Sequence, residues 1–436
     1  MSGNRSANGT ANESGRGGSG TPPRVVVTGM GAVTALGNDV PSTWEGLVAG
    51  RSGIRTIESF DPSRLTSRMA GEVRGLDASH VLDRKDLRRT DRYIVLGLVA
   101  AREAMDAAGL PERLEGELAA ETGVILGTGL GGVGTFIDNV TTSIERGPDR
   151  ISPFFIPMGI PNVGAGQIAI STGAIGPNFA IASACATGGH AIGEAWETIR
   201  RGDAAVMLAG GTEACLREAL IGGFCAMRAL STRNDDPAGA SRPFDADRDG
   251  FVIGEGAGVL VLESLDHADA RGAEPLAELV GYGATADASH LTLPAPGGIG
   301  AVRAARRALE KAGLSPDAIQ HLNAHATSTV EGDKAELQAI RSIFGDHAPR
   351  VAVTANKSML GHTLGAAGAI EAIATIQAIR TSCVPPTINL HRPDAAAEGL
   401  GLTPNAGRSV TIEAALSNSF GFGGQNSALV FRRWVR

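Results

Sequence analysis

Short apolar runs alternate with helix-like patterns along most of the chain. Residues Ile94 to Ala108 place Leu98, Ala101 and Met105 at steps of three and four, which is typical of one apolar helix face, and residues 302–312 repeat the pattern. Runs rich in Val, Ile and Leu predict strands at 25–27, 123–126, 204–208, 258–262, 276–280, 351–353 and 427–431. The first run is expected to end in a turn at Thr28-Gly29. Apolar strands that alternate with helices predict an α/β protein with buried sheets.

The pattern also repeats at long range. An apolar strand and turn at 24–35 has a counterpart at 276–287. Each half then carries a small-residue turn that leads into an Ala- and Gly-rich helix, at Ser183–Ile192 and at Lys357–Ile370. These features favour a duplication that brings catalytic residues to the junction of two related halves. We place the N-terminal half at residues 24–268 and the C-terminal half at residues 269–436.

Composition narrows the class of protein. Residues 1–23 contain hardly any aliphatic side chains and predict a disordered tail. Over the whole chain 43% of residues are apolar, as in globular proteins, and the net charge of −7 argues against a nucleic-acid partner. No apolar run is long enough to span a membrane. The four cysteines show neither metal-ligand nor C-x-x-C spacing, so we expect a soluble, reduced, cytoplasmic protein without a catalytic metal.

Cys185 is the first candidate for chemistry. It lies in the segment Ser183–His190, between an apolar run and a helical pattern, and small residues surround it. At the start of a helix the macrodipole and the free N–H groups favour a thiolate. Taken alone, Cys185 can equally be a small buried core residue.

Two histidines in the second half are candidates for its partners. His325 lies among hydroxyl residues in Asn323–Thr329, and His362 lies at the start of another small-residue helix. A cysteine with distant histidines is typical of covalent acyl chemistry, although a lone histidine is usually structural. The segment Asn418–Asn426 is expected to be a flexible aromatic–glycine loop over the active site or, alternatively, a bulge that packs two phenylalanines into the core.

The motifs together are similar to those of a known family. S-A-C-A-T-G, N-A-H-A-T-S-T, K-S-M-L-G-H and N-S-F-G-F-G-G occur in this order, and the resemblance runs from about Arg24 to Phe431. The chain resembles β-ketoacyl-[acyl-carrier-protein] synthase II, the elongating condensing enzymes of type II fatty acid synthesis in the thiolase superfamily. The resemblance implies an α/β thiolase fold, a duplicated five-layered α-β-α-β-α, and a homodimer.

The resemblance also implies a reaction, the decarboxylative Claisen condensation of malonyl-acyl carrier protein with an acyl group held on Cys185. His325 and His362 would hold the malonyl thioester carbonyl and promote loss of carbon dioxide, because two N–H donors stabilise an enolate. The backbone N–H groups of Cys185 and Phe422 would form the oxyanion hole. Lys357 and Glu336 would support the histidines through hydrogen bonds.

Further residues acquire roles from the same resemblance. Phe422 would be the gating ring, with Phe420 beside it at the substrate. The pantetheine and acyl-pocket positions would be Thr327, Thr329, Leu130, Phe155 and Phe224. No cofactor is expected, since the substrate carries its own phosphopantetheine, but a structural monovalent cation is possible by analogy. Residues that would dock an acidic acyl carrier protein are Lys85, Arg88, Arg89 and Arg228, for which a solvated surface is the alternative.

Three positions depart from the family pattern and leave substrate length and carrier identity open. Ala326 stands where Gly is usual, Gln425 replaces Thr or His beside the gate, and Asp149 occupies a position that is often basic.

The rival interpretations differ in their catalytic residues. A degradative thiolase needs a second cysteine in 420–426, where none occurs, and initiating synthases have Asn in place of His362. A chain-length factor lacks the nucleophile. The remaining alternative is the active ketosynthase subunit of a type II polyketide or polyene synthase, paired with such a factor.

Overall fold

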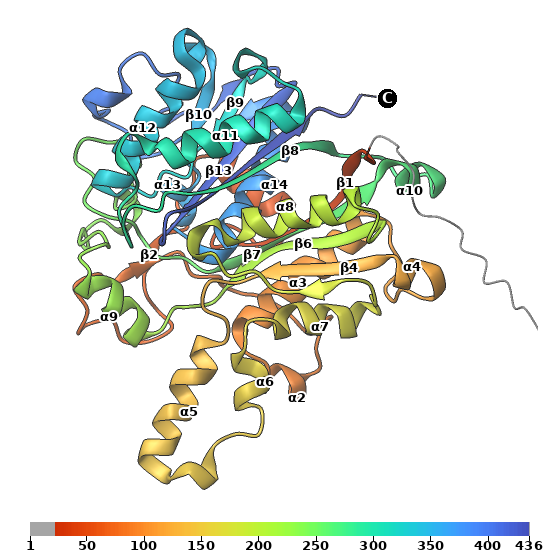
Figure 1. Ribbon diagram of the computed structural model, residues 1–436. Helices are drawn as coiled ribbons and strands as arrows, with labels where there is room; N and C mark the ends of the chain where they lie inside the picture. The colour runs from red at the N-terminus through yellow and green to blue at the C-terminus, as the bar shows by residue number, and fades with distance from the viewer. Residues whose placement is uncertain (1–21, 436) are drawn as a thin grey trace, which may run out of the picture.

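A ten-stranded mixed sheet forms the framework of the protein in the computed structural model, which describes residues 22–435 (Figure 1). Its strands from the N-terminal half are β1 (Val25–Val33), β4 (Thr122–Gly127), β5 (Asn178–Phe179), β6 (Val206–Glu213) and β7 (Gly256–Ser264). Its strands from the C-terminal half are β8 (Ala277–Ala286), β9 (His321–Asn323), β10 (Ala352–Thr354), β13 (Ala414–Gly421) and β14 (Gln425–Arg432). The strands predicted from sequence all fall on members of this sheet.

The two halves of the sheet have the same topology. The order is β5-β4-β6-β7-β1 in one half and β10-β9-β13-β14-β8 in the other, so each half places its strands as third, second, fourth, fifth and first. In both halves the first three neighbours are parallel and the last two pairings are antiparallel. β1 also pairs with β8 and joins the halves. This repeated order confirms the duplication that the sequence indicated.

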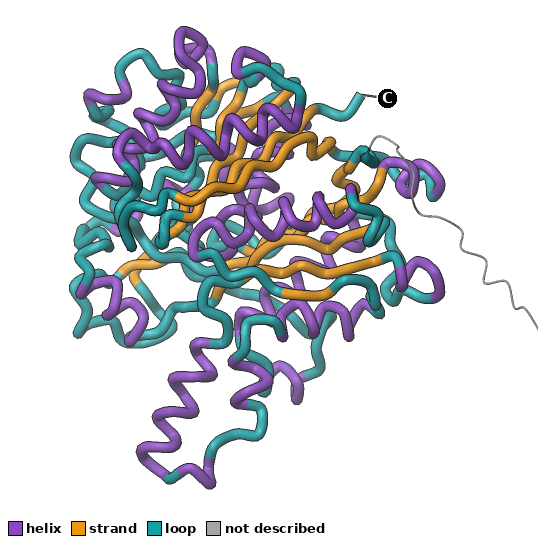
Figure 2. Tube along the Cα trace, in the orientation of Figure 1, coloured by secondary structure: helices purple, strands orange, loops and turns teal. Residues whose placement is uncertain are grey.

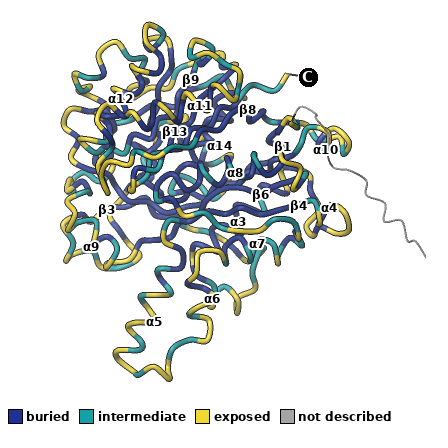
Figure 3. Tube along the Cα trace, viewed as in Figure 1, coloured by how far each residue is buried: buried dark blue, intermediate teal, exposed yellow. Residues whose placement is uncertain are grey.

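Helices complete five layers. The outer face of the N-terminal half is covered by α3 (Arg92–Ala107) and α7 (Val163–Thr172), and that of the C-terminal half by α11 (Ile299–Ala312) and α12 (Val330–Phe344). Between the two half-sheets α8 (Thr187–Arg200) packs against α14 (Ala367–Thr381) (Figure 2). Because sheet or helix lies on every side of α14, it is buried from Ala367 to Ile379 (Figure 3). This is the predicted thiolase fold.

The remaining elements are short or peripheral. The helices are α1 (Val40–Val48), α2 (Arg84–Leu87), α4 (Gly116–Ala120), α5 (Val133–Arg146), α6 (Phe155–Gly159), α9 (Glu218–Ala226), α10 (Leu265–Ala270) and α13 (Lys357–Leu360). The short strands are β2 (Arg55–Thr56), β3 (Met69–Ala70), β11 (Cys383–Val384) and β12 (Arg408–Ser409). No helix within residues 22–435 is both long and apolar enough to cross a membrane. Apart from Pro22 and Pro23, the predicted tail lies outside the described residues.

Two sequence predictions about turns are wrong. Thr28-Gly29 does not end the first strand; β1 runs on to Val33 through an irregularity in register between Val27 and Gly29. Gly29 and Gly31 let α3 approach, since a side chain there would collide with helix carbonyls. The segment Asn418–Asn426 is not a long loop either. It is the β13–β14 hairpin, whose turn uses Gly423 and Gly424 at φ 87° and 73°.

Candidate active site

A cavity of about 480 Å³ lies where the two halves meet, and it collects most of the predicted site residues. Its lining comes from the ends of strands and the starts of helices in both halves. The predicted residues that line it are Cys185, His325, His362, Glu336, Thr327, Thr329, Leu130, Phe224, Phe420, Phe422 and Arg228.

Cys185 lies in a sharp turn at the base of this cavity. It occupies a 3₁₀ turn, Ala184–Ala186, that leads directly into α8. Ala184 adopts φ 49°, a conformation that L-residues rarely take, and this turns the next side chain out of the path of the helix. Burial raises the pKa of Cys185 to about 11, against smaller opposing effects of the Lys357 charge and the Phe422 and Cys185 N–H groups. The sequence predicted a thiolate at this helix start, but burial raises the pKa of Cys185 by more than the helix start lowers it, so the free site holds a thiol.

His325 and His362 face each other at nearly right angles, with ring centroids 5.4 Å apart. Burial, and then the positive charge of Lys357, hold the pKa of both histidines well below the usual range, so both rings are neutral. The Lys357 ammonium lies 3.5 Å from His325 Nδ1. Because an ammonium only donates, Nδ1 is the acceptor and His325 carries its proton on Nε2. Neither ring nitrogen of His362 has a hydrogen-bond partner among residues 22–435, so both are free for a ligand.

Two buried carboxylates organise this pair. Glu336 accepts hydrogen bonds from the backbone N–H groups of His325 and Ala326, at 2.8 and 2.6 Å, and so fixes the loop rather than a ring. Glu371 forms an ion pair with Lys357. Burial raises the pKa of each carboxyl to about 7. Sequence reasoning missed Glu371, although it is the only charged residue in the stretch 367–379, and that is a signal that could have found it.

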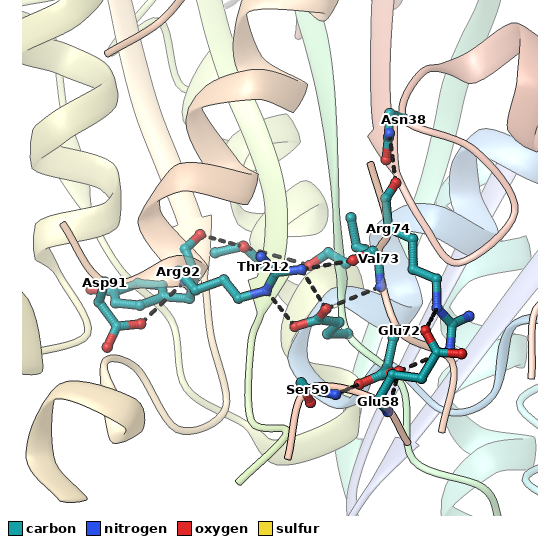
Figure 4. Close-up of polar contacts among 12 residues, drawn as sticks. Asn38, Glu58, Ser59, Glu72, Val73, Arg74, Asp91, Arg92 and Thr212 are labelled. Atoms are coloured by element: carbon teal, nitrogen blue, oxygen red, sulfur yellow. Dashed lines mark hydrogen bonds and ion pairs between the residues drawn. The ribbon is translucent and has the colours of Figure 1, made fainter. Parts of the chain in front are cut away.

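His362 is also held through its backbone. Its N–H donates to Val252 O at 2.7 Å, and its carbonyl accepts from Gly254 N at 2.9 Å. Glu255 follows Gly254 in the chain. Its carboxylate accepts hydrogen bonds from Val73 N at 3.0 Å and from the Arg92 guanidinium at 2.8 and 2.7 Å. Figure 4 shows Arg92 and Val73 within this polar cluster. The His362 loop is thus tied to the start of α3.

The rest of the lining includes both aromatic and hydroxyl side chains. Phe420 packs at an angle against His325, and Phe251 packs edge-to-face against His362, with ring centroids 5.4 and 5.5 Å apart; Phe224 packs edge-to-face against Phe251. The hydroxyl oxygens of Thr327 and Thr329 are 3.0 Å apart at the start of α12. Phe422 is about one-third exposed at the hairpin tip.

Some predicted residues are not brought to the cavity. Phe155 lies on α6, packed edge-to-face against Phe136 of α5, and does not line the cavity of its own chain. Lys85, Arg88 and Arg89 are exposed on and after α2, outside the cavity lining, with the Arg89 guanidinium over the Phe154 ring.

The three departures from the family pattern lie in different surroundings. Ala326 is buried in the cavity wall, and Gln425 opens β14 at the hairpin. Asp149 is exposed in the turn Pro148–Arg150. Only Ala326 therefore touches the cavity directly.

Comparison with known proteins decides the family. Residues 23–268 match the family described as "Beta-ketoacyl synthase, N-terminal domain", and residues 276–391 match "Beta-ketoacyl synthase, C-terminal domain". The chain belongs to the β-ketoacyl synthase family. It is 48% identical over 412 residues to the 3-oxoacyl-[acyl-carrier-protein] synthase 2 of Synechocystis sp., covering 94% of this chain and 98% of that protein.

Solved structures of other β-ketoacyl synthases are similar over nearly the whole length. The ketosynthase in a complex with its type II polyketide acyl-carrier protein and a bound hexaketide has a TM-score of 0.87 and 35% identity, covering 95% of this chain and all of that one. The ishigamide ketosynthase/chain length factor has a TM-score of 0.87 and 34% identity with the same coverage. No group of three or more His, Cys, Asp or Glu side chains within residues 22–435 is arranged to hold a metal ion.

Proposed function

We propose that this β-ketoacyl synthase catalyses the decarboxylative condensation of malonyl-acyl carrier protein with an enzyme-bound acyl thioester, giving 3-oxoacyl-acyl carrier protein in fatty acid elongation. The observation that carries the proposal is that one cysteine thiol and two neutral histidines line the same cavity. The relatives named 3-oxoacyl-[acyl-carrier-protein] synthase 2 support the fatty acid pathway.

In the first step the Cys185 sulfur attacks the carbonyl of the acyl-carrier thioester. A new S–C bond forms, the bond from the carbonyl carbon to the carrier sulfur breaks, and the thiol proton passes to that sulfur, which leaves as a thiol. Negative charge develops on the carbonyl oxygen beside the sulfur, and the N–H groups of Cys185 and Phe422, which interact with the sulfur in the free site, are close enough to donate to that oxygen. The raised pKa of Cys185 means that the thiol must give up its proton during acylation rather than beforehand.

In the second step the two histidines act on the malonyl thioester. His325 donates from Nε2, and His362 has free ring nitrogens, so both can hydrogen-bond the thioester carbonyl oxygen. The C–CO₂⁻ bond breaks, carbon dioxide leaves, and the electron pair forms an enolate stabilised by the two donors. The enolate carbon attacks the acyl carbonyl on Cys185, the S–C bond breaks, and the Cys185 thiolate takes up a proton from water. Neutral imidazoles suit this step because each can donate a hydrogen bond to the enolate oxygen without transferring its proton to the enolate.

A reconstituted assay tests the reaction. Purified enzyme is given malonyl-acyl carrier protein and acyl-carrier primers of graded length, and the products are measured by mass spectrometry. We expect a 3-oxoacyl product two carbons longer than the primer, with one carbon dioxide released per turnover. Absence of product with every primer would overturn the proposal, and the preferred primer length would define the substrate.

We place a structural monovalent cation, rather than a catalytic metal, near Glu371. Glu371 Oε2 and Asn323 Oδ1 are buried and have no hydrogen-bond partner among the described residues. The two residues are in contact, since Asn323 Nδ2 donates to the Glu371 carbonyl. Carboxylate and amide oxygens are the kinds of ligand that a hard cation binds. Such an ion would hold the acid that pairs with Lys357, and no reaction step passes through it.

We assign carrier-protein docking to Arg228 and to the basic cluster of Lys85, Arg88 and Arg89. Arg228 is exposed and lines the cavity, so it can meet a carrier whose pantetheine arm enters there. Positive groups on a chain with net charge −7 suit an acidic partner. Replacing Arg228 by Glu should raise KM for the carrier substrate and weaken its dependence on salt.

We propose a homodimer through α5, α6, α7 and β5. This face, where α5, α6 and α7 lie close together (Figure 1), carries many exposed apolar side chains and includes β5, which is the edge strand of the sheet. The exposed apolar residues are Phe136, Val140, Ile144, Ile156, Ile160, Ile170, Ile175 and Phe179. Phe155 lies on the same face and would reach a cavity only in the partner subunit. Sedimentation of Val140→Asp and Ile144→Asp variants tests this, since a dimer should dissociate.

The alternative partner is a chain-length factor, which would make this chain the active ketosynthase of a polyketide or polyene pathway. The ishigamide ketosynthase/chain length factor supports that alternative. Co-purification from the source cell decides between a homodimer and a heterodimer with a cysteine-less paralogue.

We also propose a cytoplasmic location, because all four cysteines are free, as in a reducing compartment.

A further inference from the structure

A third histidine, His190, lies beside the reaction site without lining the cavity. It is half-buried on α8, one turn beyond Cys185. Its Nδ1 lies 2.7 Å from the Ser183 hydroxyl, and its Nε2 lies 3.3 Å from the Asn426 carbonyl oxygen. The ring therefore spans two segments that are far apart in sequence and come from different halves of the protein.

The hydrogen-bond partners of His190 determine which tautomer its imidazole ring adopts. A backbone carbonyl can only accept, so His190 carries its proton on Nε2 and donates to Asn426. Nδ1 is then an acceptor, and the Ser183 hydroxyl donates to it. Burial lowers the pKa of His190, which favours this neutral form. One ring thus makes two directed bonds of opposite sense.

One end of the bridge holds the turn that presents the nucleophile. Ser183 N donates to Thr187 Oγ1 at 2.8 Å, and its carbonyl accepts from Ala186 N at 3.1 Å. With the His190 bond, every polar group of Ser183 has a partner. The next residue is Ala184 at φ 49°, a conformation that persists only when its surroundings hold it.

The other end holds the hairpin that carries Phe422. Asn426 Nδ2 donates to Asp287 Oδ1 and to the Gly424 carbonyl, at 2.8 and 3.2 Å. The hairpin also lies close to the nucleophile turn, because a side chain at Gly421 would come within 2.6 Å of Ser183 O. Because the nucleophile turn and the hairpin are in such close contact, a change in the distance between them would displace the N–H groups that each carries.

We infer that His190 is a positioning residue that sets the distance between the N–H groups of Cys185 and Phe422, and so the geometry of the oxyanion hole. The inference rests on the proposed function, in which these two groups stabilise the tetrahedral oxyanion. Apart from the Phe422 N–H near the reacting sulfur, no side-chain hydrogen bond within residues 22–435 links 183–190 to 418–426 except that of His190. Donor placement matters because an oxyanion donor loses most of its effect when displaced.

Two near-isosteric variants separate the two bonds. In His190→Asn the amide reaches the place of Nδ1 and can keep the Ser183 bond, but it loses the Asn426 bond. In His190→Gln the amide reaches the place of Nε2 and can keep the Asn426 bond, but it loses the Ser183 bond. A bridge fails when either end is cut, so both variants should transfer an acyl group from acyl-carrier protein to Cys185 roughly 10- to 100-fold more slowly than wild type.

Alkylation of Cys185 by iodoacetamide provides the discriminating measurement. This displacement forms no oxyanion, so its rate reports the reactivity of the thiol, on which the Phe422 N–H has a smaller influence than burial and the Lys357 charge. We expect alkylation within about twofold of wild type in both His190 variants, with acyl transfer slowed. His347 supplies the matched control, since it is also half-buried and bonded to a backbone carbonyl, Ile319 O, at 3.1 Å. His347→Asn and His347→Gln should leave both rates unchanged.

The outcomes are distinct. Parallel loss of alkylation and acyl transfer would show that His190 supports the thiol or the local fold, and it would overturn the inference. Full acyl transfer in either His190 variant would do the same, since one bond would then suffice. Ser183→Ala removes the same Ser183–His190 hydrogen bond that His190→Gln removes. Combining the two substitutions should therefore slow acyl transfer no further than His190→Gln alone. Failure of the proposed function looks different, because wild-type enzyme would then transfer no acyl group at all.

Discussion

The two halves of the protein contain the same sharp turn, and only one of them holds a nucleophile. In the N-terminal half the turn Ala184–Ala186 leads into α8, and in the C-terminal half Leu364–Ala366 leads into α14. The residue that opens each turn has positive φ, 49° at Ala184 and 46° at Leu364. Gly365 therefore occupies the place that Cys185 has in the first half.

The difference shows how a duplicated backbone has come to serve two purposes. A Cβ at Gly365 would lie 2.4 Å from Gly129 N and 2.7 Å from Glu213 Oε2, so position 365 of the second turn has no room for a side chain. Instead, Gly365 N donates to the buried Glu213, which also accepts from Gly129 N, at 3.0 and 2.8 Å. The first turn presents a reactive group, and the second supports the cavity and is preceded by His362.

Removing the group that only the first turn supplies should have the largest effect. Cys185→Gln should abolish condensation, a loss on the order of 10³-fold or more, since no thioester can form. Decarboxylation of malonyl-carrier protein should persist, because the histidine pair is intact. Intact-mass analysis after exposure to acyl-carrier protein checks the first point, and carbon dioxide release checks the second. Cys225→Ser, outside the cavity lining, is the control; normal acylation of Cys185→Gln would contradict the assignment.

Removing a group that only the second half supplies should have the complementary effect. His325→Ala should still accept an acyl group on Cys185 but should decarboxylate malonyl-carrier protein roughly 10²- to 10³-fold more slowly, as expected for loss of a donor to the developing enolate. Single-turnover measurements of the two half-reactions separate the steps. Equal loss in both would argue that His325 acts in acylation as well.

Adding a side chain to the second turn tests whether its glycine is required. Gly365→Ala should lower the free energy of unfolding by about 1–3 kcal/mol, because the new methyl group meets backbone and carboxylate atoms that cannot both retreat. Gly166→Ala in α7 is the matched control, since nothing lies within 4 Å of a Cβ there. Chemical denaturation measures both variants, and equal stability would show that the second turn can accommodate a side chain.

The smallest effect concerns the carboxylate that joins the two halves. Burial raises the pKa of Glu213 from an ordinary 4.5 to about 7. The native state therefore holds this proton at pH values where the unfolded chain has lost it. Its contribution to stability is present below about pH 4.5 and is lost as the pH rises towards 7.

Glu213→Gln should make the decline of stability over that window shallower by at most about 1.4 kcal/mol per pH unit. Denaturation curves between pH 4.5 and 7.5 measure this slope. The exposed Glu310→Gln on α11 serves as the control. An unchanged slope in Glu213→Gln would mean that Glu213 is ionised throughout.

Much of the fold could be predicted because each element depends on its own residues. The helix of residues 94–108 corresponds to α3, and the predicted strands correspond to members of the sheet, because periodicity of apolar positions is a local signal. The ends of elements were less accurate. Thr28-Gly29 has the composition of a turn, but tertiary contact with α3 keeps it in β1 as a register irregularity.

The candidate site was predictable in its residue types rather than in its electrostatics. Cys185, His325 and His362 lie in motifs that the sequence displays directly. Their protonation states could not be predicted from the sequence. The start of a helix suggests a thiolate, whereas burial raises the pKa of Cys185. The role of Glu371 and the bridge through His190 were also hidden, since both depend on partners distant in sequence.

The sequence by itself determined which elements form, that the halves are related, and which side chains carry the chemistry, because these follow from local periodicity and short motifs. Tertiary structure alone decided which of those side chains meet. It excluded Phe155 from the cavity of its own chain and made both histidines neutral. The physical reason is that desolvation and hydrogen bonding depend on how completely the two halves enclose the cavity, which no single segment specifies.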